Sequence, residues 1–219
     1  TIADAASVTI NSSNADANKV RNDLTSLALD DAETQTLVVS GGNNAGIDIG
    51  NITTAAALES LTLTTGSNSD SIVGTMVTAT GLKTLSYTVN GGSGANTSTI
   101  ATGVLGATTA AQLTTINAQV NGVGSSMNLE AIDSASTTAA TSVVLAANSA
   151  NSTLNLLTGQ GDDTESIINL GTGTLASLSI TVADNATLTV DAAGSAGTIT
   201  SGAITAAAIS LGNFSTLTD

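Results

Sequence analysis

The stretch Leu58-Glu59-Ser60-Leu61-Thr62-Leu63 leads directly into the glycine turn Thr65-Gly66-Ser67-Asn68-Ser69-Asp70. Its apolar residues follow the pattern U-x-x-U-x-U, where U is apolar, so the last residues alternate between apolar and polar side chains. Such alternation predicts a short strand with one buried face. The turn that follows is rich in Gly, Ser, Asn and Asp, which are typical of sharp corners. The unit therefore predicts a strand that ends in a tight turn.

The same apolar ladder recurs along the chain at uneven intervals. Its copies are Leu24-Leu27-Leu29, Leu58-Leu61-Leu63, Leu82-Leu85-Tyr87, Leu113-Ile116-Ala118 and Leu175-Leu178-Ile180. In solenoid proteins each repeat supplies one short strand, and the next repeat covers its apolar edge. Because the spacing is uneven, we predict an all-β, irregular parallel β-solenoid (β-helix) rather than a regular leucine-rich array. The alternative architecture is a β-sandwich of the immunoglobulin type.

One segment near the N-terminus departs from this pattern. Residues 17–29 lack glycine and place Val20, Leu24 and Leu27 at helical spacing. This spacing predicts one short helix near the N-terminus of the solenoid.

Composition is uniform from one end of the chain to the other. Thr, Ala, Ser, Gly and Asn dominate, and no proline-rich or charged linker interrupts the sequence. We therefore expect residues 1–219 to form a single elongated β-solenoid domain. The chain begins with Thr1 and its first residues lack the basic and apolar regions of a secretory signal, so we expect it to be a segment of a longer surface protein.

The balance of charges excludes several classes of partner. The chain has 17 acidic residues, three basic residues and a formal charge of −14. Nucleic acid is not expected as a partner, because phosphate binding requires clustered cations. No apolar run approaches the roughly 20 residues that cross a bilayer, so membrane insertion is not expected either. The absence of cysteine means that disulfides cannot stabilise the domain, a role that calcium could fill.

Catalysis is not expected from the residue inventory. The sequence contains neither histidine nor cysteine, which excludes a Ser-His-Asp triad, a Cys-His pair and the usual zinc ligand sets. Adjacent carboxylates such as Asp162 and Asp163 would point to opposite faces of a strand and so could not form a facing pair. We therefore predict that the protein is not an enzyme.

Four glycine turns share one composition, at residues 41–44, 65–72, 91–97 and 158–163. They resemble the calcium-binding nonapeptide G-G-x-G-x-D-x-U-x of parallel β-helices. The second turn keeps a glycine, the aspartate and the apolar residue, and the fourth keeps two glycines and the aspartate. The alternative reading is that they are ordinary turns in which Asn, Asp and Gly satisfy the backbone.

Calcium takes six to eight oxygen ligands from carboxylates, amides and backbone carbonyls, and glycine turns let carbonyls converge. Three aspartates in these turns supply charge, two asparagines supply neutral oxygens, and one glutamate lies close in sequence. The candidate calcium ligands are Asn68, Asp70, Asn96, Asp162, Asp163 and Glu165.

A Thr/Ala/Ser/Gly/Asn-rich chain whose ladder 58–63 runs into the turn 65–70 resembles Gram-negative S-layer proteins of the Caulobacter and Campylobacter type. The resemblance implies type I secretion, folding around calcium outside the cell, and a two-dimensional lattice of identical copies. It also implies attachment to lipopolysaccharide through other regions of the parent protein. The alternative function is the stalk or binding module of a secreted RTX-type adhesin, which shares these sequence features.

Overall fold

The computed structural model shows an all-β protein. It describes residues 2, 4–16, 18–29, 33–53, 55–76, 81–91, 98–102, 113–129, 132–133, 142–156, 168–169, 177–190, 199–200, 207–211 and 216–218. All regular secondary structure in these residues is β-strand, so none of them forms a helix long and apolar enough to cross a membrane. The prediction of an all-β chain is confirmed.

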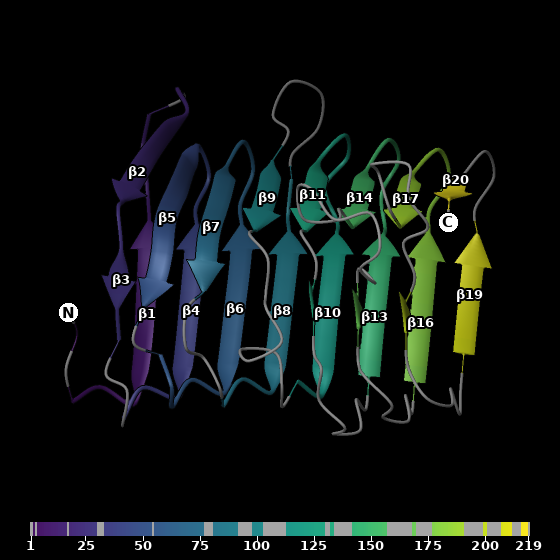
Figure 1. Ribbon diagram of the computed structural model, residues 1–219. Coiled ribbons are helices and arrows are strands. Elements are labelled where there is room, and N and C mark those ends of the chain that lie inside the picture. Colours follow the sequence, from purple (N-terminus) through teal and green to yellow (C-terminus); the bar gives the residue numbers. More distant parts are fainter. Residues whose placement is uncertain are drawn as a thin grey trace.

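The first sheet contains eight of the described strands, which lie side by side in one layer (Figure 1). Each strand pairs with the strand that the next repeat contributes, so the order in the sheet follows the order in the chain. The strands are β1 (Ser7–Ser12), β4 (Thr36–Gly41), β6 (Ser60–Thr65), β8 (Thr84–Val89), β10 (Thr115–Val120), β13 (Ser142–Ala147), β16 (Ser177–Val182) and β19 (Ala207–Leu211).

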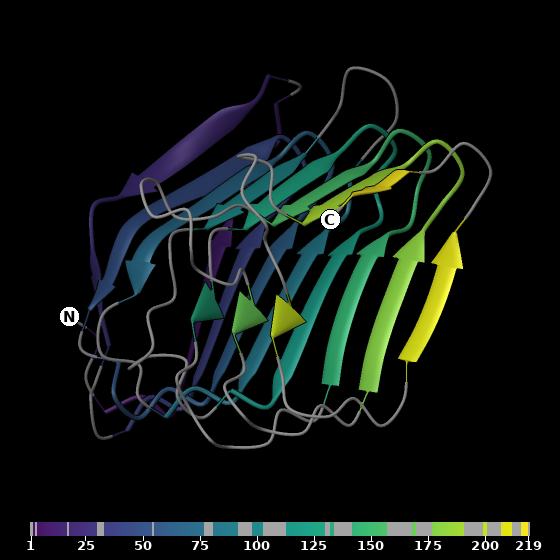
Figure 2. The same ribbon diagram turned by 45° about the vertical axis from the view of Figure 1, so that its right-hand side comes forward.

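The second sheet forms another side of the stack, and the order of its strands also follows the order in the chain (Figure 2). Its described strands are β2 (Val20–Leu24), β5 (Ala45–Thr53), β7 (Asp70–Met76), β9 (Thr99–Thr102), β11 (Ser126–Leu129), β14 (Thr153–Leu156), β17 (Thr187–Val190) and β20 (Thr216–Thr218), with the short β3 (Leu27–Ala28) also paired to β5. A third, smaller sheet joins β12 (Ile132–Asp133), β15 (Ile168–Asn169) and β18 (Ile199–Thr200) on a further side of the stack (Figure 2).

Every pairing between the described strands is parallel and connects one coil with the next. An immunoglobulin-type sandwich is built from antiparallel strands, so that alternative is excluded. Equivalent residues of consecutive coils are 24 positions apart for Glu59 and Lys83 and 31 positions apart for Ser86 and Asn117. The chain is therefore a parallel β-solenoid with coils of variable length, as predicted.

The apolar ladders form continuous columns in the core. Leu61 pairs with Leu37 in the preceding coil and with Leu85 in the following coil, and all three side chains are buried. Leu63 and Tyr87 each lie two residues further along their strands, and they form a second column beside the first. Burying a side chain of this size contributes about 1.5–3 kcal/mol. The described buried residues form one continuous cluster, so each coil is stabilised mainly by its neighbours.

The predicted N-terminal helix is wrong. Val20–Leu24 is strand β2, which pairs residue by residue with β5, and Leu27–Ala28 is strand β3, which also pairs with β5. Val20 is exposed rather than part of an apolar helix face, whereas Leu27 and Leu29 alternate into the core. Pairing with the strand of the next coil outweighs the local helical spacing, because the backbone of β5 offers a complete set of hydrogen-bond partners.

Candidate functional site

The chain passes from the first sheet to the second through a stacked corner. One residue of the corner has a left-handed backbone in each of several coils, namely Asn44, Asn68, Gly124, Asn151 and Asn185, with φ between 54° and 67°. Only glycine and, with a small penalty, asparagine or aspartate adopt this conformation routinely. This requirement explains why asparagine and glycine recur in the sequence between the strands.

Asparagine side chains also bond to one another along this corner. Asn121 Nδ2 donates to Asn90 Oδ1 at 3.2 Å, and Asn148 Nδ2 donates to Asn121 Oδ1 at 2.8 Å. Asn68 Nδ2 donates to Asn44 Oδ1 at 2.9 Å in the same manner. These bonds run from coil to coil, so the corner residues align the stack as well as turning the chain.

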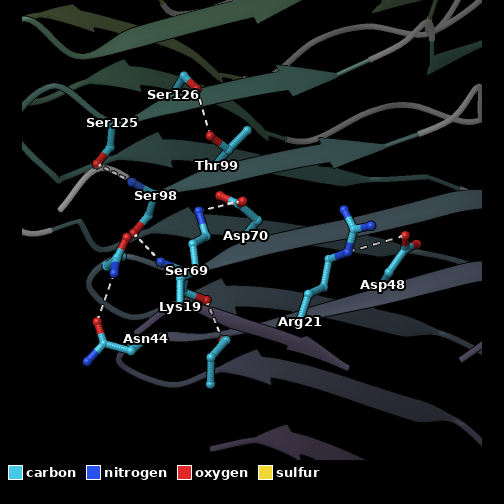
Figure 3. A network of polar contacts seen from close by, with 12 residues as sticks. Lys19, Arg21, Asn44, Asp48, Ser69, Asp70, Ser98, Thr99, Ser125 and Ser126 are labelled. Atoms are coloured by element: carbon cyan, nitrogen blue, oxygen red, sulfur yellow. Dashed lines mark hydrogen bonds and ion pairs between the residues drawn. The ribbon is translucent and has the colours of Figure 1, made fainter. Parts of the chain in front are cut away.

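A buried serine column lies directly inside the corner (Figure 3). Ser69 Oγ donates to the carbonyl of Ala45 at 2.6 Å, and Ser98 Oγ donates to the carbonyl of Gly66 at 2.6 Å. The backbone N–H of Ser69 donates in turn to Ser98 Oγ at 3.1 Å. These hydroxyls satisfy backbone groups that would otherwise be buried without partners, and so their role is structural rather than nucleophilic.

Ion pairs cross the outer face of the second sheet near the N-terminus (Figure 3). Lys19 Nζ lies 2.5 Å from Asp70 Oδ2, and Arg21 Nε lies 3.3 Å from Asp23 Oδ1 and 3.9 Å from Asp48 Oδ2. The third cation, Lys83, pairs with Glu59 at 2.8 Å. All three basic residues of the sequence therefore take part in ion pairs, and the sequence contains 17 acidic residues against these three.

Two of the predicted calcium ligands lie in the described part of the chain. Asn68 occupies a left-handed corner position, and Asp70 begins β7 with a half-buried side chain. The intervening Ser69 is buried, so Asn68 and Asp70 lie on either side of a residue that faces the core. The remaining candidates, Asn96, Asp162, Asp163 and Glu165, lie outside the described residues.

Asn68 and Asp70 by themselves fit only part of a calcium coordination shell. The Asn68 amide nitrogen bonds to Asn44, which leaves its Oδ1 as an acceptor, while one oxygen of Asp70 contacts Lys19. No cluster of three or more acidic side chains that could hold a metal ion occurs within the described residues. Because calcium needs six to eight oxygens, further ligands would have to come from backbone carbonyls, water or other residues. The calcium assignment stays a prediction.

Two hollows lie on the N-terminal coil, where β2 pairs with β5. One has a volume of about 270 Å³ and is lined by residues that include Ile10, Asn22 and Ile47, and the other, of about 400 Å³, is lined by residues that include Asp48 and Asn51. Asp23 and Leu24 line both of them. The acidic groups here face Arg21, and the sequence supplies no histidine or cysteine to act beside them.

The outer face of the first sheet carries a pattern that the sequence analysis missed. Its outward positions are matched from coil to coil, and one column consists of hydroxyl residues only: Ser7, Thr36, Ser60, Thr84, Thr115, Ser142 and Ser177. The signal in the sequence is the Ser or Thr immediately before the apolar position of each strand. It becomes visible only once the register between coils is known.

No protein-family model, no curated protein and no solved structure matches this chain. The fold therefore defines its class, a parallel β-solenoid, and its function has to be argued from its surfaces and charges.

Proposed function

We propose that this chain is a segment of an S-layer lattice subunit, an extracellular structural protein that self-assembles with calcium on a Gram-negative cell surface. The observation that carries the proposal is the repetition of one outward hydroxyl position through successive in-register coils. A rigid, repetitive body suits a protein whose partner is another copy of itself. The near absence of aromatic residues, which form 1% of the chain, argues against a concentrated binding hot spot.

The charge balance supports a role for calcium in assembly. Copies that each carry a net charge of −14 repel one another when they pack closely. The three cations already contact carboxylates within the chain, and three positive charges are few against 17 acidic residues at a contact between copies. A divalent cation would remove this repulsion and would also bind to the folded form, which raises the stability of that form.

The proposal is tested by following assembly of the purified protein in millimolar calcium and in EGTA, using sedimentation and negative-stain electron microscopy. We expect ordered sheets with calcium and dispersed particles with EGTA. Asp70→Asn should weaken the calcium response, whereas the matched variant Asp48→Asn, which also loses an ion-paired carboxylate of the second sheet, should not. Dispersed particles under both conditions would contradict the lattice assignment.

A second candidate function is the stalk of a secreted RTX-type adhesin. The continuous apolar core that joins one coil to the next favours it, because such a stack suits a stiff spacer. The same experiment separates the two functions, since a stalk should remain monomeric and elongated when calcium is added.

A further inference from the structure

Asparagine is followed by glycine at two places in the sequence, Asn90-Gly91 and Asn121-Gly122. The two pairs occupy equivalent positions in consecutive coils, because β8 and β10 pair in register up to the residue before each asparagine. A Cβ on Gly91 would collide with the side chain of Ser125, and a Cβ on Gly122 would collide with the backbone of Gly91. The close approach of the two coils therefore requires glycine after each asparagine.

An Asn-Gly pair can lose the side-chain amide without an enzyme. The backbone nitrogen of glycine attacks Cγ of asparagine, so that an N–Cγ bond forms, the Cγ–Nδ2 bond breaks and ammonia leaves. Water then opens the five-membered succinimide ring and yields aspartate or isoaspartate. The net change is one amide exchanged for one carboxylate. Glycine favours the ring closure because it has no Cβ to obstruct the attack and can adopt the required backbone angles.

The structure holds the two asparagine side chains differently. Asn121 Nδ2 donates to Asn90 Oδ1 at 3.2 Å, and Asn121 Oδ1 accepts from Asn148 Nδ2 at 2.8 Å. Both polar atoms of the Asn121 side chain are therefore bonded within this asparagine row, which consists of Asn90, Asn121 and Asn148. Asn90 Oδ1 accepts from Asn121, but Asn90 Nδ2 donates to no acceptor within the described residues. Asn90 is thus restrained at one end and Asn121 at both.

The two glycines are restrained to different extents as well. Gly122 is buried, and its carbonyl accepts the backbone N–H of Ser125 at 3.1 Å. Gly91 is only half-buried, and within the described part of the chain its carbonyl accepts no such bond. Ring closure requires the glycine nitrogen to move towards Cγ of the preceding asparagine. The backbone and the side chain therefore both favour reaction at Asn90 over reaction at Asn121.

We propose that Asn90 is a site of spontaneous deamidation in the folded protein and that the asparagine row protects Asn121. An aspartate at position 90 keeps an oxygen that accepts from Asn121 Nδ2, and a bond to a carboxylate is stronger than one to an amide. An aspartate at position 121 would instead lose the donor to Asn90 and place two oxygens against each other. The reaction adds negative charge to a chain that already carries −14, and it does not depend on the proposed lattice function.

The test follows both asparagines in the purified protein at neutral and mildly alkaline pH. Peptic fragments prepared at acidic pH, where the reaction is slow, are analysed by mass spectrometry so that deamidation is quantified separately at Asn90 and Asn121. Protein unfolded in guanidinium chloride is the reference. Asn148→Ala removes one restraint on Asn121. The matched control Asn155→Ala removes a bond of the same kind, to Asn128 in the second sheet. Circular dichroism shows which variants are folded.

We expect Asn90 to react about tenfold faster than Asn121 in the folded protein, since one hydrogen bond and the buried glycine restrain Asn121 further. The two rates should be similar in the unfolded reference, and both should rise with pH because the attacking nitrogen must lose its proton. Asn148→Ala should speed the reaction of Asn121 several-fold, whereas Asn155→Ala should not. Equal rates in the folded protein, or an intact Asn90 while the unfolded reference reacts, would overturn the site. An unchanged Asn121 rate in folded Asn148→Ala would overturn the protective role of the row.

Discussion

The ammonium group of Lys19 lies 2.5 Å from Oδ2 of Asp70 and joins the segment before β2 to the start of β7. Among the described residues, Asp70 is the carboxylate that the sequence predicts to be a calcium ligand. An incoming calcium ion would have to compete with Lys19 for this oxygen. The pair is partly exposed, with side-chain exposures of 35% and 31%, so the ion pair is worth about 1 kcal/mol at most.

Lys19→Met should therefore increase calcium affinity if Asp70 is a ligand. The expected gain is at most about fivefold, because the ion pair is worth about 1 kcal/mol at most and about 1.4 kcal/mol corresponds to a factor of ten. Isothermal titration calorimetry of the wild type, Lys19→Met and Asp70→Asn measures the effect. Equal affinity in all three proteins would remove Asp70 from the list of ligands.

Leu61→Ala should destabilise the solenoid by about 2–5 kcal/mol. Leu61 is fully buried between Leu37 and Leu85, so truncation leaves a cavity shared by consecutive coils. Chemical denaturation measures the loss. Thr62→Ala, the adjacent outward position, is the control and should change the free energy of unfolding by less than about 1 kcal/mol. Similar losses for both variants would contradict the assigned inward and outward faces of β6.

The corner position Gly124 should accept asparagine and reject valine. Its φ of 67° matches the left-handed backbone of Asn44, Asn68 and Asn151 in other coils. Gly124→Asn should leave the melting temperature nearly unchanged, whereas Gly124→Val should cost about 1–2 kcal/mol because a branched Cβ is strained in this conformation. Thermal denaturation checks both variants, and a tolerated valine would show that the corner differs from the one described.

Alkaline pH should destabilise the protein through Tyr87, whose side chain is buried. Burial raises the pKa of Tyr87 above its ordinary value, because the core disfavours the phenolate. The stabilisation is fully present below the unfolded-state pKa of about 10 and is lost as the pH rises above it, since only the unfolded chain then releases the proton. Denaturant midpoints measured between about pH 9 and pH 11 should fall for the wild type and fall less for Tyr87→Phe. Parallel curves would exclude this role of Tyr87.

The sequence predicts the strands well wherever local alternation coincides with burial. The ladders at Leu58, Leu82 and Leu113 all enter the core as expected, because a period of two is a local property of the chain. The N-terminal ladder is different. Leu24 lies in β2 of the second sheet. The spacing of Val20 and Leu24 predicts a helix, but both residues pair with strand β5.

The surfaces are harder to predict than the core, because they depend on register between coils. Asn90 and Asn121 bond to each other although 31 residues separate them, and Asn121 reaches Asn148 across only 27. No fixed period aligns such residues in the sequence. Lys19 and Asp70 meet for the same reason, and the column of hydroxyl residues on the first sheet emerges only when β6 is placed beside β8.

In-register parallel stacking of coils underlies the whole account, and spin labelling tests it most directly. The chain contains no cysteine, so the double variant Thr62→Cys/Ser86→Cys carries nitroxides at only two defined sites. These positions are paired on neighbouring strands about 4.8 Å apart, and we expect strong dipolar broadening of the electron paramagnetic resonance spectrum. Thr62→Cys/Asn117→Cys, two strands apart, should show clearly weaker broadening. Equal or absent broadening in the two variants would contradict the solenoid.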